Sequence, residues 1–267
     1  MPPILYGTAW KKERTAALVE LAIRCGFRGI DTACQPKHYH EPGVGEGIAA
    51  ASCHGVPRDA LYLQTKFTPL TGQDPARIPY TAGALLAQQV AESCAVSLRN
   101  LHTDYLDCLV LHSPLPTMAE TLEVWRAFEE CVERGEVRRL GISNCANLKT
   151  LKALCESARI KPTVVQNRFY QATHYDRDLR AFCVAQGIQY QSFWTLTANP
   201  TLLAAKPIKR LARQYVRTPA QILFRFLTQR GIVPLTGTSS ETHMREDLAI
   251  FDFELSRDEC RELDTLV

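Results

Sequence analysis

Short apolar runs alternate with longer amphipathic stretches along most of the chain. The clearest run, Cys108-Leu-Val-Leu111, is apolar at every position, whereas a strand with one exposed face alternates between polar and apolar residues. Strands buried on both faces have this continuous pattern, which is typical of parallel sheets. On this basis eight segments are predicted to be strands: Ile4–Gly7, Gly29–Ala33, Leu61–Phe67, Tyr105–His112, Val137–Asn144, Thr163–Phe169, Ile188–Phe193 and Ile232–Gly237.

Apolar residues between these runs recur at the spacing of one helix face. In Thr15–Cys25, for example, Leu18, Val19, Ala22 and Ile23 follow the i, i+3, i+4 pattern. The same pattern predicts five further helices: Ala84–Leu98, Ala119–Arg134, Leu148–Ala158, Arg177–Ala185 and Ala220–Leu227. Strands that alternate with helices in this way predict a closed α/β barrel or a doubly wound sheet.

No linker rich in proline, glycine or serine divides the 267 residues, and the composition does not shift along the chain. We therefore expect residues 1–267 to form a single domain, and this length fits one (β/α)8 TIM barrel. The segment Gly43-Val-Gly-Glu-Gly47 has the look of a dinucleotide-binding loop, but its spacing differs and no strand leads into it. That segment is predicted to begin a helix instead.

Bulk composition narrows the range of partners. Hydrophobic residues make up 46% of the chain, charged residues 22%, and the net charge of +3 includes no basic run, which argues against a nucleic acid partner. No apolar stretch reaches the ~18 residues of a membrane span, and the start of the chain lacks a signal-peptide pattern. The 10 cysteines form no C-x-x-C pair and no zinc-type cluster with histidine. We expect a monomer in the cytoplasm that uses no metal and acts on a small molecule.

Polar residues stand near the points where several predicted strands end. Asp31 lies on the second strand, Lys66 on the third and His112 on the fourth, and Tyr39 follows in the loop after the second. In an α/β barrel these ends converge at one mouth, where functional residues collect. Burying Lys66 there without a partner would be costly, and Asp31 is its natural partner.

These residues belong to a series of short motifs in a fixed order. Together the motifs resemble the signature blocks of the aldo-keto reductase family, from about Tyr6 to the end of the chain. Any one block is a weak signal, but six in sequence, at barrel strand ends, form a specific one. The blocks are Gly29-Ile-Asp-Thr-Ala33 with Tyr39 and Val44-Gly45, Thr65-Lys66, Leu111-His-Ser-Pro114, Gly141-Ile-Ser-Asn144, Gln166-Asn167, and Gly237-Thr238 with Arg245-Glu-Asp-Leu248.

The resemblance implies a catalytic tetrad of Asp31, Tyr39, Lys66 and His112 in a (β/α)8 barrel. Such an enzyme passes hydride from NAD(P)H to an aldehyde or ketone, and Tyr39 would supply the proton as general acid. Because the phenol pKa lies near ~10, a neighbouring Lys66 cation is expected to lower the pKa of Tyr39. Asp31 would keep Lys66 charged and oriented, and His112 would hydrogen-bond the carbonyl oxygen.

Each tetrad residue also has a plain structural interpretation. Asp31 and Lys66 are compatible with a structural ion pair, His112 with a core histidine and Tyr39 with an exposed loop. The interval from Asp31 to Tyr39 is also longer than the family's commonest spacing. Since histidines flank Tyr39 on both sides, His38 and His40 remain alternatives for the acid.

The family resemblance also places the cofactor. Ser143, Asn144 and Gln166 would hold the nicotinamide carboxamide, whose donors and acceptor suit amide and hydroxyl side chains, and Phe193 would lie under its ring. The full set expected at the cofactor is Gly7, Thr8, Asp31, Ser143, Asn144, Gln166, Phe193, Trp194, Leu196, Gly237, Thr238, Ser239, Ser240, His243, Glu246 and Asp247.

The expected phosphate block departs from the family pattern. His243 stands where many members have an arginine, so the strong charge-assisted contact to the adenosine 2′-phosphate is missing there. Hydroxyls of Thr238-Ser-Ser240 and a helix N-terminus can still bind phosphate. NADP(H) is expected in preference to NAD(H), with modest discrimination.

At the substrate end we expect Trp10, Tyr39, His112 and Trp194. The loop after His112 is short, and the chain has few residues for a C-terminal loop, which predicts a shallow, open pocket. Two other functions fit parts of the pattern. One is a non-catalytic, cofactor-binding barrel that serves as a regulatory or scaffold subunit. The other is a metal-dependent hydrolase, for which only Asp31 and His112 stand at strand ends as ligands.

Overall fold

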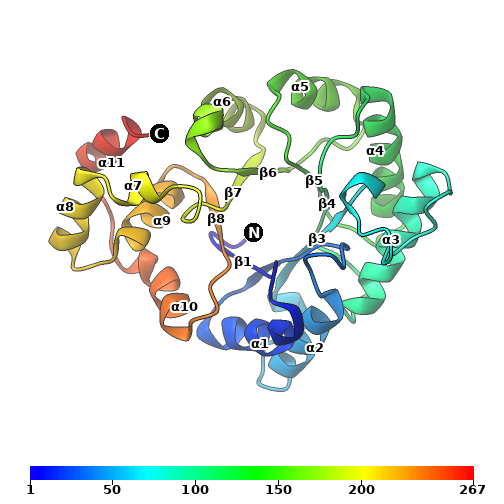
Figure 1. The fold of residues 1–267 in the computed structure, drawn as a ribbon, viewed down its shortest axis with the longest axis horizontal. Helices are drawn as coiled ribbons and strands as arrows, with labels where there is room; N and C mark the ends of the chain where they lie inside the picture. The colour runs from blue at the N-terminus through cyan, green and yellow to red at the C-terminus, as the bar shows by residue number, and fades with distance from the viewer.

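The computed structural model describes residues 1–267 and shows a closed barrel of eight parallel strands surrounded by helices (Figure 1). Neighbours in the barrel follow chain order, and β8 closes the ring by pairing with β1. The predicted (β/α)8 barrel is therefore confirmed. The strands are β1 Leu5–Gly7, β2 Gly29–Asp31, β3 Tyr62–Phe67, β4 Cys108–Leu111, β5 Leu140–Ser143, β6 Val164–Arg168, β7 Gln189–Phe193 and β8 Val233–Thr236. The helices are α1 Thr15–Cys25, α2 Glu41–Ser52, α3 Leu86–Asn100, α4 Met118–Glu133, α5 Leu148–Ser157, α6 Arg177–Gln186, α7 Pro200–Leu203, α8 Lys206–Tyr215, α9 Pro219–Gln229, α10 Glu241–Leu248 and α11 Arg257–Asp264.

The continuous apolar pattern of β4 arises because both of its faces are buried. Cys108 and Val110 point into the barrel, where they belong to a small interior cluster of 6 buried residues. Leu109 and Leu111 point outward into the main core of 55 buried residues, which fills the space between the barrel and its helices. Successive residues of a strand point to opposite faces, so a strand between these two cores has no polar face.

The strands are shorter than the apolar runs predict. The predicted strand Tyr105–His112 pairs regularly only at Cys108–Leu111, and Val137–Asn144 only at Leu140–Ser143. Barrel strands are tilted and staggered, so the ends of these runs have no continuous neighbour. Only a single bridge, between Leu106 and Val137, marks their beginning.

Two helices interrupt the expected alternation of one helix per strand. Between β7 and α9 the chain forms α7 and α8, which the apolar pattern does not predict. In α8 only Ile208, Leu211 and Ala212 are buried, and the rest of the helix is polar or charged, so its apolar signal is narrow. No helix in the structure is both long and apolar enough to cross a membrane.

The glycines of Gly43–Gly47 lie inside α2, as the sequence predicts, and not in a phosphate-binding loop. They permit close packing. A methyl group on Gly45 would lie 2.2 Å from the backbone oxygen of Asn100, and one on Gly47 would lie 2.5 Å from that of Ala16. The glycines therefore let α2 approach its neighbours at backbone distance.

Replacing Gly45 with alanine should destabilise the protein by about 1–3 kcal/mol, the usual cost of overpacking, although alanine is the better helix former. Gly83→Ala is the matched control, because nothing lies within 4 Å of a methyl group there. The free energy of unfolding in urea measures both variants. An equal, small effect at the two sites would contradict the packing explanation for Gly45.

Candidate active site

A cavity of about 770 Å³ opens at the mouth of the barrel, where the carboxyl ends of the strands meet. Most residues predicted for the site line this cavity: Gly7, Trp10, Asp31, Tyr39, His112, Ser143, Asn144, Gln166, Phe193, Trp194, Leu196, Gly237, Thr238, His243, Glu246 and Asp247. The barrel thus brings together residues that lie up to 240 positions apart in the chain, since Gly7 and Asp247 are both at its wall.

Four predicted residues do not line the cavity. Lys66 lies beneath its floor and is 1% exposed. Thr8 is buried as well, and its hydroxyl donates to the backbone oxygen of Asp31 at 3.0 Å. Ser240 caps α10 by accepting a hydrogen bond from the backbone N–H of His243, and Ser239 is exposed beside it.

The floor of the cavity is an ion pair between Lys66 and Asp31. The Lys66 ammonium donates to both carboxylate oxygens of Asp31, at 2.8 Å and 2.6 Å, and to the backbone oxygen of Thr32 at 2.8 Å. Burial by itself would lower the pKa of Lys66, but the charges of Asp31 and Tyr39 raise it, and the net direction is upward. Lys66 is therefore a buried cation whose three donors are all occupied.

Three glutamines extend this pair across the barrel interior. Gln64 and Gln166 each donate to Asp31 Oδ1, at 2.7 Å and 2.9 Å, and both also donate to Gln191 Oε1. Gln191 in turn donates to Gln64 Oε1 at 3.0 Å. Buried charges persist only where their remaining hydrogen-bonding capacity is satisfied, and this ring of amides satisfies Asp31 from strands on opposite sides of the barrel.

Tyr39 stands above this floor. The Lys66 ammonium lies 5.3 Å from the centre of its ring, and the hydroxyl forms no hydrogen bond within the protein. Burial raises the pKa of Tyr39, and the nearby Lys66 cation opposes that rise without reversing it. Lys66 therefore lowers the pKa of Tyr39 as expected, but desolvation raises that pKa by more, so the net direction is upward. The phenol is protonated at neutral pH.

His112 faces Tyr39 edge-on, with 6.0 Å between the ring centres. Burial and the Lys66 cation lower the pKa of His112 to about 3, so the imidazole is neutral. Its Nδ1 lies 2.7 Å from the hydroxyl of Thr68, which leaves Nε2 free for a ligand. Thr68 was not predicted, since nothing in the sequence distinguishes it from other strand-end threonines.

The two histidines beside Tyr39, His38 and His40, make other contacts. The His38 ring packs on Trp10 with 3.8 Å between ring centres, at the rim of the cavity. His40 caps α2, because its Nδ1 accepts from the backbone N–H of Gly43 at 3.2 Å. Of the two, only His38 lines the cavity.

Three predicted cofactor residues line one wall in contact with each other. Gln166 has its amide nitrogen engaged by Asp31 and Gln191, so its Oε1 is the atom left to accept from a ligand. Ser143 donates to the backbone oxygen of Gln166 at 2.7 Å. Asn144 has a left-handed backbone with φ of 52° and donates to the backbone oxygen of His112 at 2.8 Å.

The far end of the cavity contains a cation, Lys11, that the sequence does not indicate. The Lys11 ammonium donates to the backbone oxygen of Gly237 and lines the cavity beside Thr238 and His243. Its proximity depends on the pairing of the first and last strands, which brings residues 226 positions apart into contact. Burial, with the charge of Arg14, lowers the pKa of Lys11.

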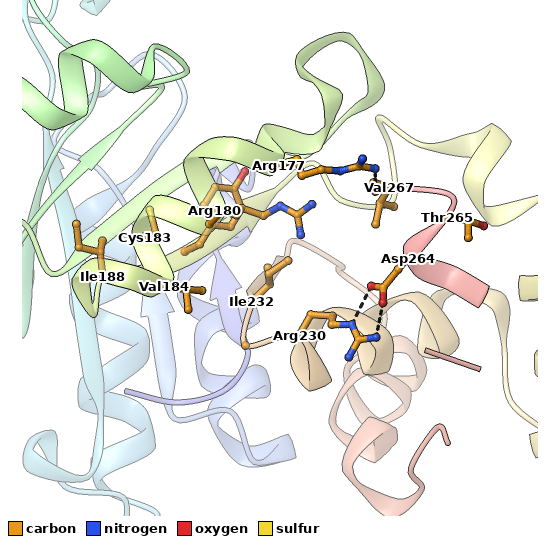
Figure 2. A pocket seen from close by; sticks show the side chains of 13 residues that line it. Arg177, Arg180, Cys183, Val184, Ile188, Arg230, Ile232, Asp264, Thr265 and Val267 are labelled. Atoms are coloured by element: carbon orange, nitrogen blue, oxygen red, sulfur yellow. Dashed lines mark hydrogen bonds and ion pairs between the residues drawn. The ribbon is translucent and has the colours of Figure 1, made fainter. Parts of the chain in front are cut away.

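Figure 2 shows a different cavity, of about 640 Å³, between α6 and α11 near the starts of β7 and β8. It has three arginines, but each already has an acceptor. Arg177 donates to the Val267 backbone oxygen, Arg180 to that of Tyr175, and Arg230 to the carboxylate of Asp264. Of these two cavities, the one at the mouth is lined by a reactive group without a partner in the protein, the Tyr39 hydroxyl.

The sequence of this chain is similar to those of known proteins. A profile of the aldo/keto reductase family matches residues 4–267. The chain is 31% identical over 248 residues to a glyoxal reductase of Bacillus subtilis, which covers 93% of this chain and 82% of the relative. It is 29% identical over 266 residues to a methylglyoxal reductase of Salmonella typhimurium, which covers 98% and 88% respectively.

Solved structures show the same arrangement of strands and helices. An aldo/keto reductase from Brucella melitensis superimposes with a TM-score of 0.84 at 26% identity, covering 100% of this chain and 95% of that one. An aldo-keto reductase from Bombyx mori, solved in complex with NADP, has a TM-score of 0.84 at 25% identity, covering 99% and 89%.

Replacing Lys66 with methionine should cost about 3–5 kcal/mol of stability, because it leaves the Asp31 carboxylate buried without a counter-charge. The double variant Asp31→Asn, Lys66→Met carries no buried charge, so it should be more stable than the single Lys66→Met variant. Urea unfolding curves measure the parent, the single variants Asp31→Asn and Lys66→Met, and the double variant. If the double variant loses the sum of the two single losses, the two side chains are not energetically coupled.

Proposed function

The chain belongs to the aldo/keto reductase family and is an NAD(P)H-dependent carbonyl oxidoreductase, and we propose that Tyr39 is the general acid with which it reduces an aldehyde or ketone to an alcohol. The observation that carries this assignment is the position of Tyr39. Its hydroxyl is free, the buried Lys66 cation lies beneath its ring, and neutral His112 lies beside it.

The wall formed by Ser143, Asn144, Gln166 and Phe193 fits the nicotinamide end of the cofactor. Gln166 Oε1 can accept from the carboxamide, while the hydroxyl of Ser143 and the amide of Asn144 supply further polar atoms. Phe193 lines the same cavity and offers an apolar face to the ring. When bound there, the nicotinamide coenzyme supplies the hydride.

The far end of the cavity fits the phosphate groups of the cofactor. Lys11 provides a cation, Gly237 and Thr238 provide polar backbone and a hydroxyl, and His243 lies 3.5 Å from the Thr238 hydroxyl. The Lys11 charge replaces part of the charged contact that the sequence around His243 lacks. This supports NADP(H) as the cofactor used in preference to NAD(H).

The proton step follows from the groups around Tyr39. A carbonyl oxygen that gains hydride develops negative charge and needs a proton, which the Tyr39 hydroxyl donates. Lys66 has no donor left for a hydrogen bond, so its cation stabilises the resulting phenolate through space. With the Thr68 hydroxyl donating to Nδ1, His112 keeps its proton on Nε2 and donates that hydrogen bond to the carbonyl oxygen.

The substrate end is framed by two exposed aromatic side chains. Trp10 is 59% exposed and Trp194 is 49% exposed, and both line the cavity. Their indole faces offer apolar contact with one N–H donor each.

Because all ten cysteines are free thiols, we place this reaction in the reducing cytoplasm.

Changing Tyr39 to phenylalanine removes the proposed donor and little else. Turnover of a generic aldehyde should fall by about 10²-fold or more, the usual scale for loss of a general acid, while NADPH affinity stays near that of the parent. Steady-state kinetics and NADPH fluorescence titration measure the two quantities. Parent-like turnover would move the donor role to His38, and a parent without turnover would favour a non-catalytic, cofactor-binding barrel.

Changing His243 to arginine adds a charge at the proposed 2′-phosphate position. The preference for NADPH over NADH should rise by about 10-fold, because a guanidinium binds phosphate through charge-assisted hydrogen bonds. Thr242→Arg adds the same charge one residue away, on a side chain outside the cavity, and should change the preference less. The dissociation constants of both coenzymes decide the question. A parent preference above ~10³-fold would require about 4 kcal/mol of phosphate recognition and would contradict the proposed weak clamp.

A further inference from the structure

Arg168 ends β6 one rung above the residues that form the floor of the site. Side chains two residues apart on a strand point to the same face, so Arg168 points the same way as Gln166, which lines the cavity. Its partner in the sheet register is Phe193, which lines the cavity as well. The backbone therefore directs Arg168 to the rim of the mouth, just outside the residues that line the cavity and next to Trp194 at the proposed substrate end.

The guanidinium of Arg168 lies against two aromatic rings. Its central carbon lies 4.2 Å from the centre of the Trp194 ring and 5.3 Å from that of Tyr170. Arg168 is half-buried, yet it forms no ion pair and no hydrogen bond with another residue. Stacking engages the flat face of a guanidinium, whereas its N–H groups lie in the plane of the group. The edge that binds a carboxylate is therefore unoccupied.

The three arginines of the cavity near the starts of β7 and β8 differ in this respect. In the outer cavity of Figure 2, Arg230 pairs with Asp264, and Arg177 and Arg180 donate to backbone oxygens. Arg168 is the cation at the mouth that is pre-oriented by stacking and still lacks an acceptor.

The acids of the site are arranged so that they do not neutralise Arg168. Asp31 is engaged by Lys66 below the floor. Glu246 and Asp247 lie on α10, with the residues of the proposed phosphate end, and Asp247 accepts from Thr236. On the opposite rim the exposed Lys37 adds positive charge next to His38. Arg168 and Lys37 thus place positive charge at the rim of the substrate end, where no other carboxylate than the engaged Asp31 lines the cavity.

We infer that Arg168 binds a carboxylate on the substrate, so that this enzyme acts preferentially on carbonyl compounds that carry an acid group, such as oxo acids and aldehydic acids. The carboxylate pairs side-on with the guanidinium edge, and the apolar part of the substrate lies along Trp194. The inference rests on the proposed function, because it assigns the substrate class of the same cavity. It adds a specificity-determining residue outside the predicted tetrad.

The test compares each acid with its own uncharged ester. Glyoxylate, succinic semialdehyde, 5-oxopentanoate and 4-carboxybenzaldehyde span several distances between carbonyl and carboxylate, and each is assayed beside its methyl ester with NADPH and with NADH. For at least one pair the parent should favour the acid by about 10- to 100-fold in kcat/KM, equivalent to about 1.4–2.8 kcal/mol at 1.4 kcal/mol per tenfold. This preference should fall as ionic strength rises.

Two variants separate charge from packing at Arg168. Arg168→Met keeps apolar contact with Trp194 without the charge, so it should abolish the preference for the acid mainly by raising KM and leave the ester unchanged. Arg168→Lys keeps the charge but not the planar guanidinium, so it should retain only part of the parent's preference for the acid. Arg177→Gln removes one positive charge at the outer cavity of Figure 2 and should leave both rates within about twofold of the parent, since Arg177 does not line the cavity at the mouth and its guanidinium donates to the Val267 backbone oxygen.

The outcomes distinguish this inference from the proposed function. If the parent reduces the esters as well as the acids, or if Arg168→Met keeps the preference, the substrate assignment is overturned while carbonyl reduction stands. If Arg168→Met slows acid and ester equally, Arg168 only supports Trp194, and the assignment also fails. If no acid and no ester is reduced with either coenzyme, the proposed function itself fails.

Discussion

The buried ion pair between Lys66 and Asp31 is the interaction on which the rest of this site depends. Taking two charges out of water is expensive, and a pair of this kind is tolerated only when every remaining donor and acceptor is satisfied. Here the barrel supplies that satisfaction from strands far apart in the chain, because Gln64, Gln166 and Gln191 reach the same carboxylate network from β3, β6 and β7. The network can form only when the sheet has closed, so the charged floor depends on the closed barrel.

Burial and the charged floor together set the protonation states of the groups above the floor. The Lys66 cation adds to burial in keeping the His112 imidazole neutral, and it opposes the rise that burial imposes on the pKa of Tyr39. A neutral imidazole can donate one hydrogen bond without competing for the proton, while the phenol remains the acid. Two adjacent groups thus receive different roles from burial beside one buried cation, in the way that neighbouring environments push titratable groups apart in other active sites.

Much of this architecture could be predicted from the sequence, but not all of it. The apolar runs predict the strands because burial on both faces leaves a continuous signal, and the need to pair a buried lysine predicts Asp31 as the partner of Lys66. Gln64 and Gln191 carry no such signal, because a glutamine inside a strand looks the same whether it faces solvent or a buried carboxylate. Lys11 lies at the cofactor end only because β1 pairs with β8, a contact that local patterns do not contain. The direction of the Tyr39 pKa shift depends on how deeply the ring is buried, which residue type and spacing alone do not determine.

Along β6, the residue that supports the reaction and the residue proposed to select the substrate occupy successive positions on the same face. On β6, Gln166 belongs to the hydrogen-bonded floor, whereas Arg168, two residues further on, stacks on Trp194 at the rim and shares no hydrogen bond with that floor. The two side chains point the same way but contact different neighbours. A substitution at the rim can therefore change which compound is held without disturbing the charges that activate it, whereas a substitution in the floor alters the buried ion pair and every group that depends on it. Because the inward-facing positions of a barrel strand form successive layers, this division needs no extra loop or domain, only a different residue one layer higher.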